Sequence, residues 1–134
     1  MAGKILPYKI FHKGGLTIGV IGIGIELEGL VDKKLYGNTI YSNPLQMADD
    51  TASMLKKDLK CDMVICLSHL GYKYTDRKIS DEVLAQESSY IDLIIGGHTH
   101  TFLDEPFRYK NKLNKEVLVA QVGWAGIRLG RVDY

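Results

Sequence analysis

The stretch that decides the fold is "IDLIIGGHTH", residues 91–100, in which an apolar run ends at two glycines and two histidines follow. An earlier stretch, "CDMVICLSHLGY" at residues 61–72, has the same plan, with an apolar run followed by a polar loop that contains a histidine. Apolar runs without strict alternation are typical of strands that are covered on both faces. Two buried strands, each ending in a histidine-bearing loop, are therefore predicted.

Further strands are predicted on both sides of this pair. Residues 8–12 and 16–25 form two extended runs that are separated by a glycine-rich turn. Residues 115–134 contain two more runs, which meet near Gly123. Residues 26–42 are mixed in character and are predicted to form a loop.

Two segments between these strands are predicted to be helices. Asn43 is a typical N-cap residue, and Pro44 suits the first helical position. The apolar residues that follow are spaced by four, three and four, which places them on one buried face: Ala48, Ala52, Leu55 and Leu59. Ser80 can cap a second, shorter helix. This alternation of strands and helices indicates an α/β fold with parallel pairing and with antiparallel strands at the ends of the chain.

The composition excludes several classes of protein. The 134-residue chain has a net charge of +1, so there is no electrostatic reason to expect a nucleic acid polymer as partner. No run of about 18 apolar residues is present, and no membrane span is expected. The first ten residues lack the pattern of a signal peptide, so either the protein is cytoplasmic or its targeting segment lies outside this chain. Cys61 and Cys66 are roughly 16 Å apart along the predicted strand, too far for a disulfide, and are expected to be buried.

Three of the four histidines follow the two central strands: His69, His98 and His100. Ligand sites in open α/β sheets lie beyond the carboxyl ends of the strands, so we expect these three side chains to converge there. Gly96 and Gly97 would let the chain turn sharply and approach the site closely. Neutral imidazole is a good ligand for zinc, manganese, iron or nickel, so the pattern predicts a site for one metal ion or two. The fourth histidine, His12, is predicted to lie on the surface.

The histidine motifs belong to a longer series: "DMVICLSHLGY" (62–72), "DEVLA" (81–85), "IDLIIGGHTHTFLDEP" (91–106) and "QVGWAGIRLGRVD" (121–133). In order and spacing this series resembles the calcineurin-like metallophosphoesterases, especially the 5′-nucleotidase branch, from about Lys9 onward. The resemblance implies a sandwich of mixed sheets flanked by helices, two divalent metal ions such as Mn, Zn or Fe, and hydrolysis of nucleotide phosphomonoesters. It also implies that His69 and His98 bind one ion and His100 the other. Members of this branch are often periplasmic or secreted.

The chain also departs from that family. Three earlier family motifs, Asp-x-His, Gly-Asp-x-x-Asp and Gly-Asn-His-Asp/Glu, supply the other ligands, the bridging carboxylate and a histidine that stabilises the leaving group or transition state. Residues 1–68 contain none of them, since Asn38 is not followed by histidine and Ile10 stands two residues before His12. The last predicted strand runs to the final residue without a stop signal. We therefore expect residues 1–134 to be one partial domain, the later part of a catalytic domain, which is inactive alone and has no catalytic residue of its own.

Two alternatives stay open, and with them the question of whether the chain is an enzyme. In the first, the three histidines bind one metal ion with a water as fourth ligand, and carboxylates come from Asp76, Asp81 or Asp104, which would make a small mononuclear hydrolase. In the second, the half-domain is not an enzyme and pairs with a partner chain that carries the missing motifs. Exposed sheet edges would also favour self-association.

Overall fold

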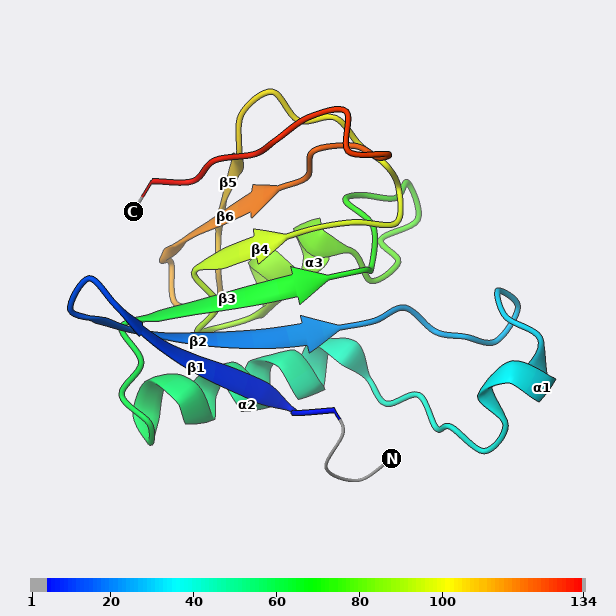
Figure 1. Ribbon diagram of the computed structural model, residues 1–134, viewed down its shortest axis with the longest axis horizontal. Coiled ribbons are helices and arrows are strands. Elements are labelled where there is room, and N and C mark those ends of the chain that lie inside the picture. The colour runs from blue at the N-terminus through cyan, green and yellow to red at the C-terminus, as the bar shows by residue number, and fades with distance from the viewer. Residues whose placement is uncertain (1–4, 134) are drawn as a thin grey trace.

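The computed structural model describes residues 5–133, which form one mixed six-stranded sheet with three helices beside it (Figure 1). The strands are β1 (Tyr8–Lys13), β2 (Leu16–Ile23), β3 (Met63–Ser68), β4 (Leu93–Ile95), β5 (Phe107–Lys110) and β6 (Glu116–Ala120). The helices are α1 (Lys33–Tyr36), α2 (Pro44–Lys57) and α3 (Asp81–Glu87). No helix in the described part of the chain is long and apolar enough to cross a membrane.

The central strands of the sheet are parallel, and this brings the loops after β3 and β4 to the same edge. The strand order is β1-β2-β3-β4-β6-β5, with β1 antiparallel to β2 and β5 antiparallel to β6. The pairs β2–β3, β3–β4 and β4–β6 are parallel. In Figure 1 these four strands point the same way, so the segments that follow them leave on one side. The predicted parallel centre and the antiparallel strand at the start of the chain are confirmed, whereas the antiparallel strand at the other edge is β5, which was not predicted.

Helices α2 and α3 cover one face of the sheet and form the core with it. The predicted caps are present, since the side chain of Asn43 accepts a hydrogen bond from Gln46 N at 3.1 Å and Ser80 caps α3 in the same way. The following apolar side chains pack together between the helices and the sheet: Ala48, Ala52, Leu55, Val64, Cys66, Leu84, Ala85, Ile94, Val117 and Val119. Leu59 was predicted on this buried face, but α2 ends before it and its side chain is exposed.

The opposite face of the sheet is apolar, and no helix of residues 5–133 packs on it. Successive strand residues point to opposite faces, so the residues between the core positions lie on this side. Val20, Ile65, Leu67 and Ile95 form what we call the open face, and the register pairs Val20 with Ile65 and Leu67 with Ile95. Leu67 is 48% exposed and Ile95 is 42% exposed. An apolar sheet face is normally buried against a second layer, and residues 5–133 provide only one sheet of the expected sandwich.

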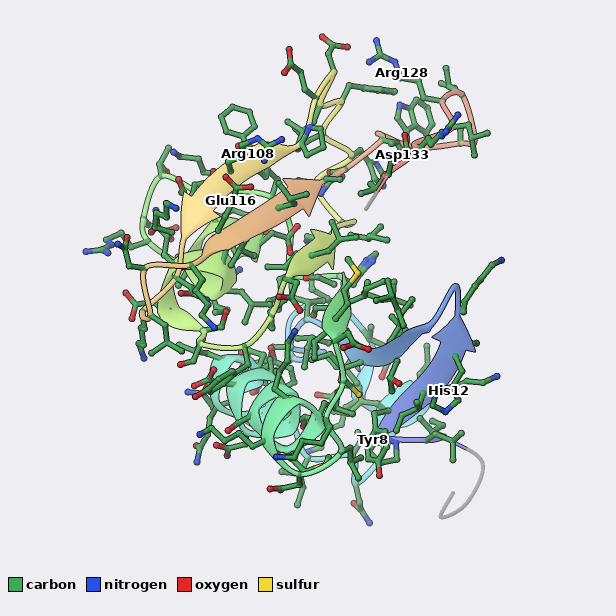
Figure 2. The ribbon with its side chains drawn as sticks, turned by 90° about the vertical axis from the view of Figure 1, so that its left-hand side faces the viewer. Tyr8, His12, Arg108, Glu116, Arg128 and Asp133 are labelled. Atoms are coloured by element: carbon green, nitrogen blue, oxygen red, sulfur yellow. The ribbon has the colours of Figure 1, made fainter. Side chains whose placement is uncertain are left out.

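The structure corrects the sequence prediction in three places. Residues 26–42, predicted to be a loop, include the four-residue helix α1. Strand β5 was not predicted, and it forms a hairpin with β6 across which Arg108 and Glu116 make an ion pair (Figure 2). Residues 127–133 were predicted to be a strand but form none, because β6 already has β4 and β5 as its two neighbours. Tyr134, the end of that predicted strand, lies outside the described residues.

Two predictions about single residues are confirmed. Cys61 and Cys66 are buried and unpaired, and burial raises the pKa of the Cys66 thiol to about 12. His12 lies exposed on β1, with Nδ1 3.3 Å from Thr17 Oγ1 (Figure 2). Neither the cysteines nor His12 is part of the histidine site.

Candidate metal centre

His69 and His98 lie next to each other where β3 and β4 end. His69 directly follows β3, and its backbone N–H donates to the carbonyl oxygen of Ile23 at the end of β2 (2.8 Å). His98 follows β4 after two glycines. The two imidazole ring centres are 5.2 Å apart, with the ring planes at 69°. Parallel pairing of β3 with β4 therefore brings two of the three predicted ligands together.

The two glycines before His98 lie where the backbone passes close to the side chains of Asp81 and His69. Glycine suits these positions because it has no side chain, and not because of its backbone conformation. A Cβ at Gly97 would lie 3.1 Å from His69 Nδ1, and a Cβ at Gly96 would lie 2.1 Å from Asp81 Oδ2. Neither glycine has a positive φ; the left-handed residues are the histidines themselves, with φ of 69° at His98 and 55° at His100. The predicted close approach is confirmed, and the sharp turn falls on residues 98 and 100.

The ring of His100 packs on a tryptophan and not on the rings of the His69–His98 pair. Its ring stacks on the indole of Trp124, with ring centres 5.9 Å apart and planes at 13°. Within residues 5–133, no group of three or more His, Cys, Asp or Glu side chains is arranged to hold a metal ion. The three histidines are thus not arranged as one three-ligand group in residues 5–133, and the ring of His100 packs on Trp124. Their role as ligands stays a prediction.

His98 borders a surface pocket of about 250 Å³. The other polar side chains that line this pocket are Glu26, Glu28, Tyr41 and Lys78. Burial lowers the pKa of His98, and the neighbouring side chains of His69, Lys78 and His100 lower it further. A lowered pKa keeps the imidazole neutral near pH 7, which is the form that binds metal ions. The two glutamates could not be predicted, because residues 26–42 carry no periodic pattern that would place them.

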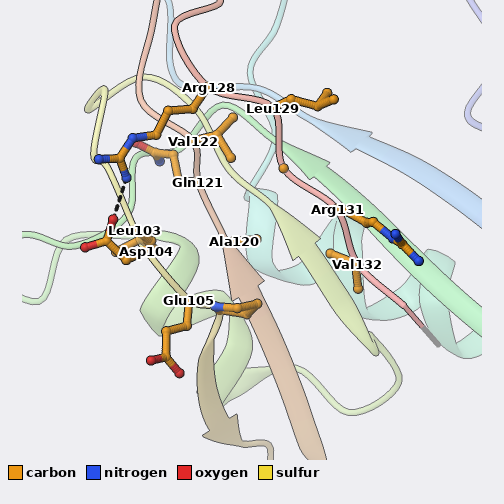
Figure 3. Close-up of a pocket in the computed structure, with 12 residues that line it drawn as sticks. Leu103, Asp104, Glu105, Ala120, Gln121, Val122, Arg128, Leu129, Arg131 and Val132 are labelled. Atoms are coloured by element: carbon orange, nitrogen blue, oxygen red, sulfur yellow. Dashed lines mark hydrogen bonds and ion pairs between the residues drawn. The ribbon is translucent and has the colours of Figure 1, made fainter.

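The three carboxylates considered for a mononuclear site face other groups. Asp104 forms an ion pair with Arg128 at 2.5 Å, beside a pocket that the C-terminal segment lines (Figure 3). Asp76 Oδ1 accepts a long hydrogen bond from Lys78 N at 3.4 Å. Asp81 is fully buried, and its Oδ1 accepts a hydrogen bond from Ser68 Oγ at 2.5 Å. The described contacts do not favour any of these three as a metal ligand.

Buried polar side chains underlie the histidine loops. Burial raises the pKa of Asp81 to about 6, although the hydrogen bond from Ser68 acts in the opposite direction. The second carboxyl oxygen, Oδ2, has no hydrogen-bond partner among the described residues. Gln121 is 1% exposed and bonds to the loop of His98 and His100. The burial of Gln121 could not be predicted, since one polar residue inside an apolar run carries no sign of it.

The donor set fits part of a metal site. His69 and His98 offer two adjacent imidazoles, and His100 offers a third further along the loop. Neutral imidazoles bring no negative charge, however, and two divalent ions close together need anionic ligands between them. In residues 5–133 no carboxylate joins the His69–His98 pair to form a group of three that could hold a metal ion.

No protein-family model matches the chain. The trifunctional nucleotide phosphoesterase YfkN of Bacillus subtilis is 30% identical over 129 residues, which cover 96% of this chain and 8% of that protein. The snake venom 5′-nucleotidase of Gloydius brevicauda is 27% identical, over 99% of this chain and 24% of that protein. The crystal structure of the calcineurin-like phosphoesterase YfkN from Bacillus subtilis matches with a TM-score of 0.63 and 26% identity, over 77% of this chain and 35% of that one. The chain thus spans a small part of each relative.

Proposed function

We propose that this chain is the later part of a domain that hydrolyses nucleotide phosphomonoesters. The chain is homologous to part of the 5′-nucleotidases and calcineurin-like phosphoesterases, and the homologous part is in their metallophosphoesterase catalytic region. The observation that carries this proposal is the pairing of His69 with His98 at adjacent parallel strand ends. The names of the relatives, a nucleotide phosphoesterase and a 5′-nucleotidase, support the substrate class.

Divalent metal ions are the cofactor of this family, and each histidine has a proposed place. His69 and His98 would bind one ion and His100 a second, and Mn, Zn or Fe suits such imidazole ligands. When bound, the ions would polarise the phosphoryl oxygens and lower the pKa of the attacking water. The chain itself contributes neutral imidazoles at fixed positions. The lowered pKa of His98 supports this role, since its ring needs no deprotonation near pH 7 before it binds.

The chain alone is proposed to have no turnover. Neutral histidines bring no negative charge, so they cannot hold two divalent ions close together. Two divalent ions 4 Å apart repel by roughly 16 kcal/mol at an effective dielectric constant of about 20. Three neutral imidazoles cannot offset that repulsion. Residues 1–68 lack the three motifs that would supply the carboxylates. Catalysis would therefore need ligands from another polypeptide segment.

A second candidate function is a half-domain that pairs with a partner chain, and the open face supports it. Leu67 and Ile95 are about half exposed on this face, and no second sheet covers them in the described residues. Strands β1 and β5 are the edges of the sheet, so each has one side without a neighbouring strand in the described residues. Such surfaces favour addition of a second sheet or, as the competing outcome, self-association of this chain.

Hydrolysis of AMP in the presence of Mn²⁺ tests both candidates. The purified chain should give no phosphate release. The mixture of the chain with a polypeptide that carries the three missing motifs should release phosphate. The His98→Ala variant should abolish this restored activity, whereas His12→Ala, on the exposed face of β1, should retain it. Turnover by the chain alone would contradict the charge argument, and a stable complex without turnover would contradict the phosphoesterase assignment.

Metal binding can be tested without any activity. Co²⁺ titration, followed by its visible absorption, should give weak binding to the chain alone, since only some of the ligands are present. His98→Ala should lose this binding, and His12→Ala should keep it. Equal binding by all three proteins would show that the His69–His98 pair is not the site.

A further inference from the structure

The two histidines of the GGHTH loop, residues 96–100, both have an unusual backbone. With φ of 69° at His98 and 55° at His100, both lie in the left-handed region that residues other than glycine rarely enter. A backbone persists in this region only where the surrounding contacts over-determine it. The loop must therefore be held by contacts close to each histidine.

Gln121 makes these contacts with a single buried amide group. It directly follows β6, and its side-chain Nε2 donates to the carbonyl oxygen of Gly97 at 2.9 Å. Its Oε1 accepts hydrogen bonds from Thr101 N and from Thr99 Oγ1, the latter at 3.2 Å. The three bonds thus fall on residues 97, 99 and 101. His98 and His100 are therefore each flanked on both sides by a residue that Gln121 holds.

Other hydrogen bonds tie the same loop to its surroundings. The N–H of Gly123 donates to the carbonyl oxygen of Thr101 at 2.9 Å, which joins the segment after β6 to the end of the loop. Thr99 Oγ1 accepts a hydrogen bond from Tyr72 N at 3.0 Å, which links the loop to the segment after β3. Gln121 directly follows β6, and its own carbonyl oxygen accepts a hydrogen bond from Leu103 N at 3.0 Å. The loop therefore cannot move away from Gln121 without breaking several of these bonds together.

We propose that Gln121 is the positioning residue of the GGHTH loop and fixes the His98 and His100 imidazoles before any metal ion binds. This inference rests on the proposed ligand role of these histidines. A carboxamide suits the position because it presents a donor and an acceptor on one planar group. Glutamate at this position would place a carboxylate oxygen next to the Gly97 carbonyl oxygen, and the two would repel. Methionine would form no hydrogen bond with Gly97, Thr99 or Thr101.

Hydrogen exchange in the metal-free chain tests the loop directly. Two amides report on the loop without bonding to Gln121, since Thr99 N–H donates to the Gly97 carbonyl at 2.9 Å and Tyr72 N–H donates to Thr99 Oγ1. In Gln121→Met, both amides should exchange about 10-fold faster relative to Asp92 N–H, which bonds to the carbonyl of a core strand. An increase confined to the loop is a change that general destabilisation would not produce.

The matched control is Asn111→Leu. Asn111 is also a buried amide, and its side chain bonds to the backbone of three residues: Ser89, Leu113 and Lys115. This variant removes a comparable set of hydrogen bonds away from the histidines, so the ratio of loop to sheet exchange should stay at the wild-type value. Gln121→Glu keeps the accepting oxygen and loses the bond to the Gly97 carbonyl. If Gln121→Met does not fold, Gln121→Glu is measured in its place.

Co²⁺ affinity gives the second readout. It should fall about 10- to 100-fold in Gln121→Met, the range found when a group that orients a metal ligand is lost, and should be kept in Asn111→Leu. A loop that exchanges no faster than the sheet, or an unchanged Co²⁺ affinity, would overturn the proposal. If the wild-type chain binds no Co²⁺, the proposed function fails, and the exchange ratio alone still decides whether Gln121 holds the loop.

Discussion

Replacing Asp81 with asparagine should stabilise the chain at neutral pH and have much less effect at pH 3.5. Asp81 is fully buried, with one carboxyl oxygen bonded to Ser68 Oγ and the other without a partner in the described residues. Burial raises its pKa from the ordinary value of 3.8 to about 6. A negative charge is therefore unfavourable at this position, whereas an uncharged amide of the same shape avoids that penalty.

The raised pKa means that the folded chain favours the protonated carboxyl. Below pH 3.8 the Asp81 side chain is neutral in both the folded and the unfolded chain, so it brings no penalty. Between that pH and about 6, only the unfolded chain ionises, and stability falls by about 1.4 kcal/mol per pH unit. Above the folded pKa the loss is complete and amounts to about 3 kcal/mol.

Urea unfolding followed by far-UV circular dichroism measures this difference. From pH 3.5 to 7.5, the unfolding free energy of Asp81→Asn minus that of the wild type should rise by about 3 kcal/mol, mostly between pH 4 and 6. Asp104→Asn, which removes an exposed carboxylate, is measured in parallel as the control. A constant difference for Asp81→Asn, or one that grows toward low pH, would refute the reasoning.

Three further predictions concern packing. Gly96→Ala should lower stability by about 1–3 kcal/mol in thermal unfolding, because the new Cβ would meet Asp81 Oδ2 at 2.1 Å, whereas Gly22→Ala, with nothing within 4 Å, should change it little. In urea unfolding, Leu55→Ala should cost about 2–5 kcal/mol, and Leu67→Ala, on the open face, less than about 1 kcal/mol. Leu67→Asp should reduce any self-association seen by sedimentation velocity while the far-UV spectrum stays unchanged, and an unaltered association would place the contact elsewhere.

The central strands and helix starts could be predicted because their signals are local. Residues 63–68 and 93–95 are apolar runs that end in polar or glycine residues, and both are strands. The caps at Asn43 and Ser80 depend only on the residues that follow them. Parallel pairing then followed from the alternation of strands and helices, and it placed His69 beside His98.

Features that depend on distant partners could not be predicted in this way. Residues 127–133 have the composition of a strand, but both sides of β6 are taken, one of them by the short strand β5. The role of Gln121 depends on a loop that lies some 20 residues earlier in the sequence. The ring of His100 stacks on Trp124, a contact that no spacing rule indicates. In each case the deciding neighbour comes from tertiary packing.

Two residues of the open face, Leu67 and Ile95, lie at the ends of β3 and β4 that precede the histidine pair. Leu67 stands two residues before His69, and Ile95 stands three residues before His98. A layer that covered this face would therefore bring its own loops to the imidazoles. A single interface could then bury the exposed aliphatic side chains and supply the carboxylates that two metal ions require. On this reasoning the chain can fold around its own core, whereas catalysis would need the second layer.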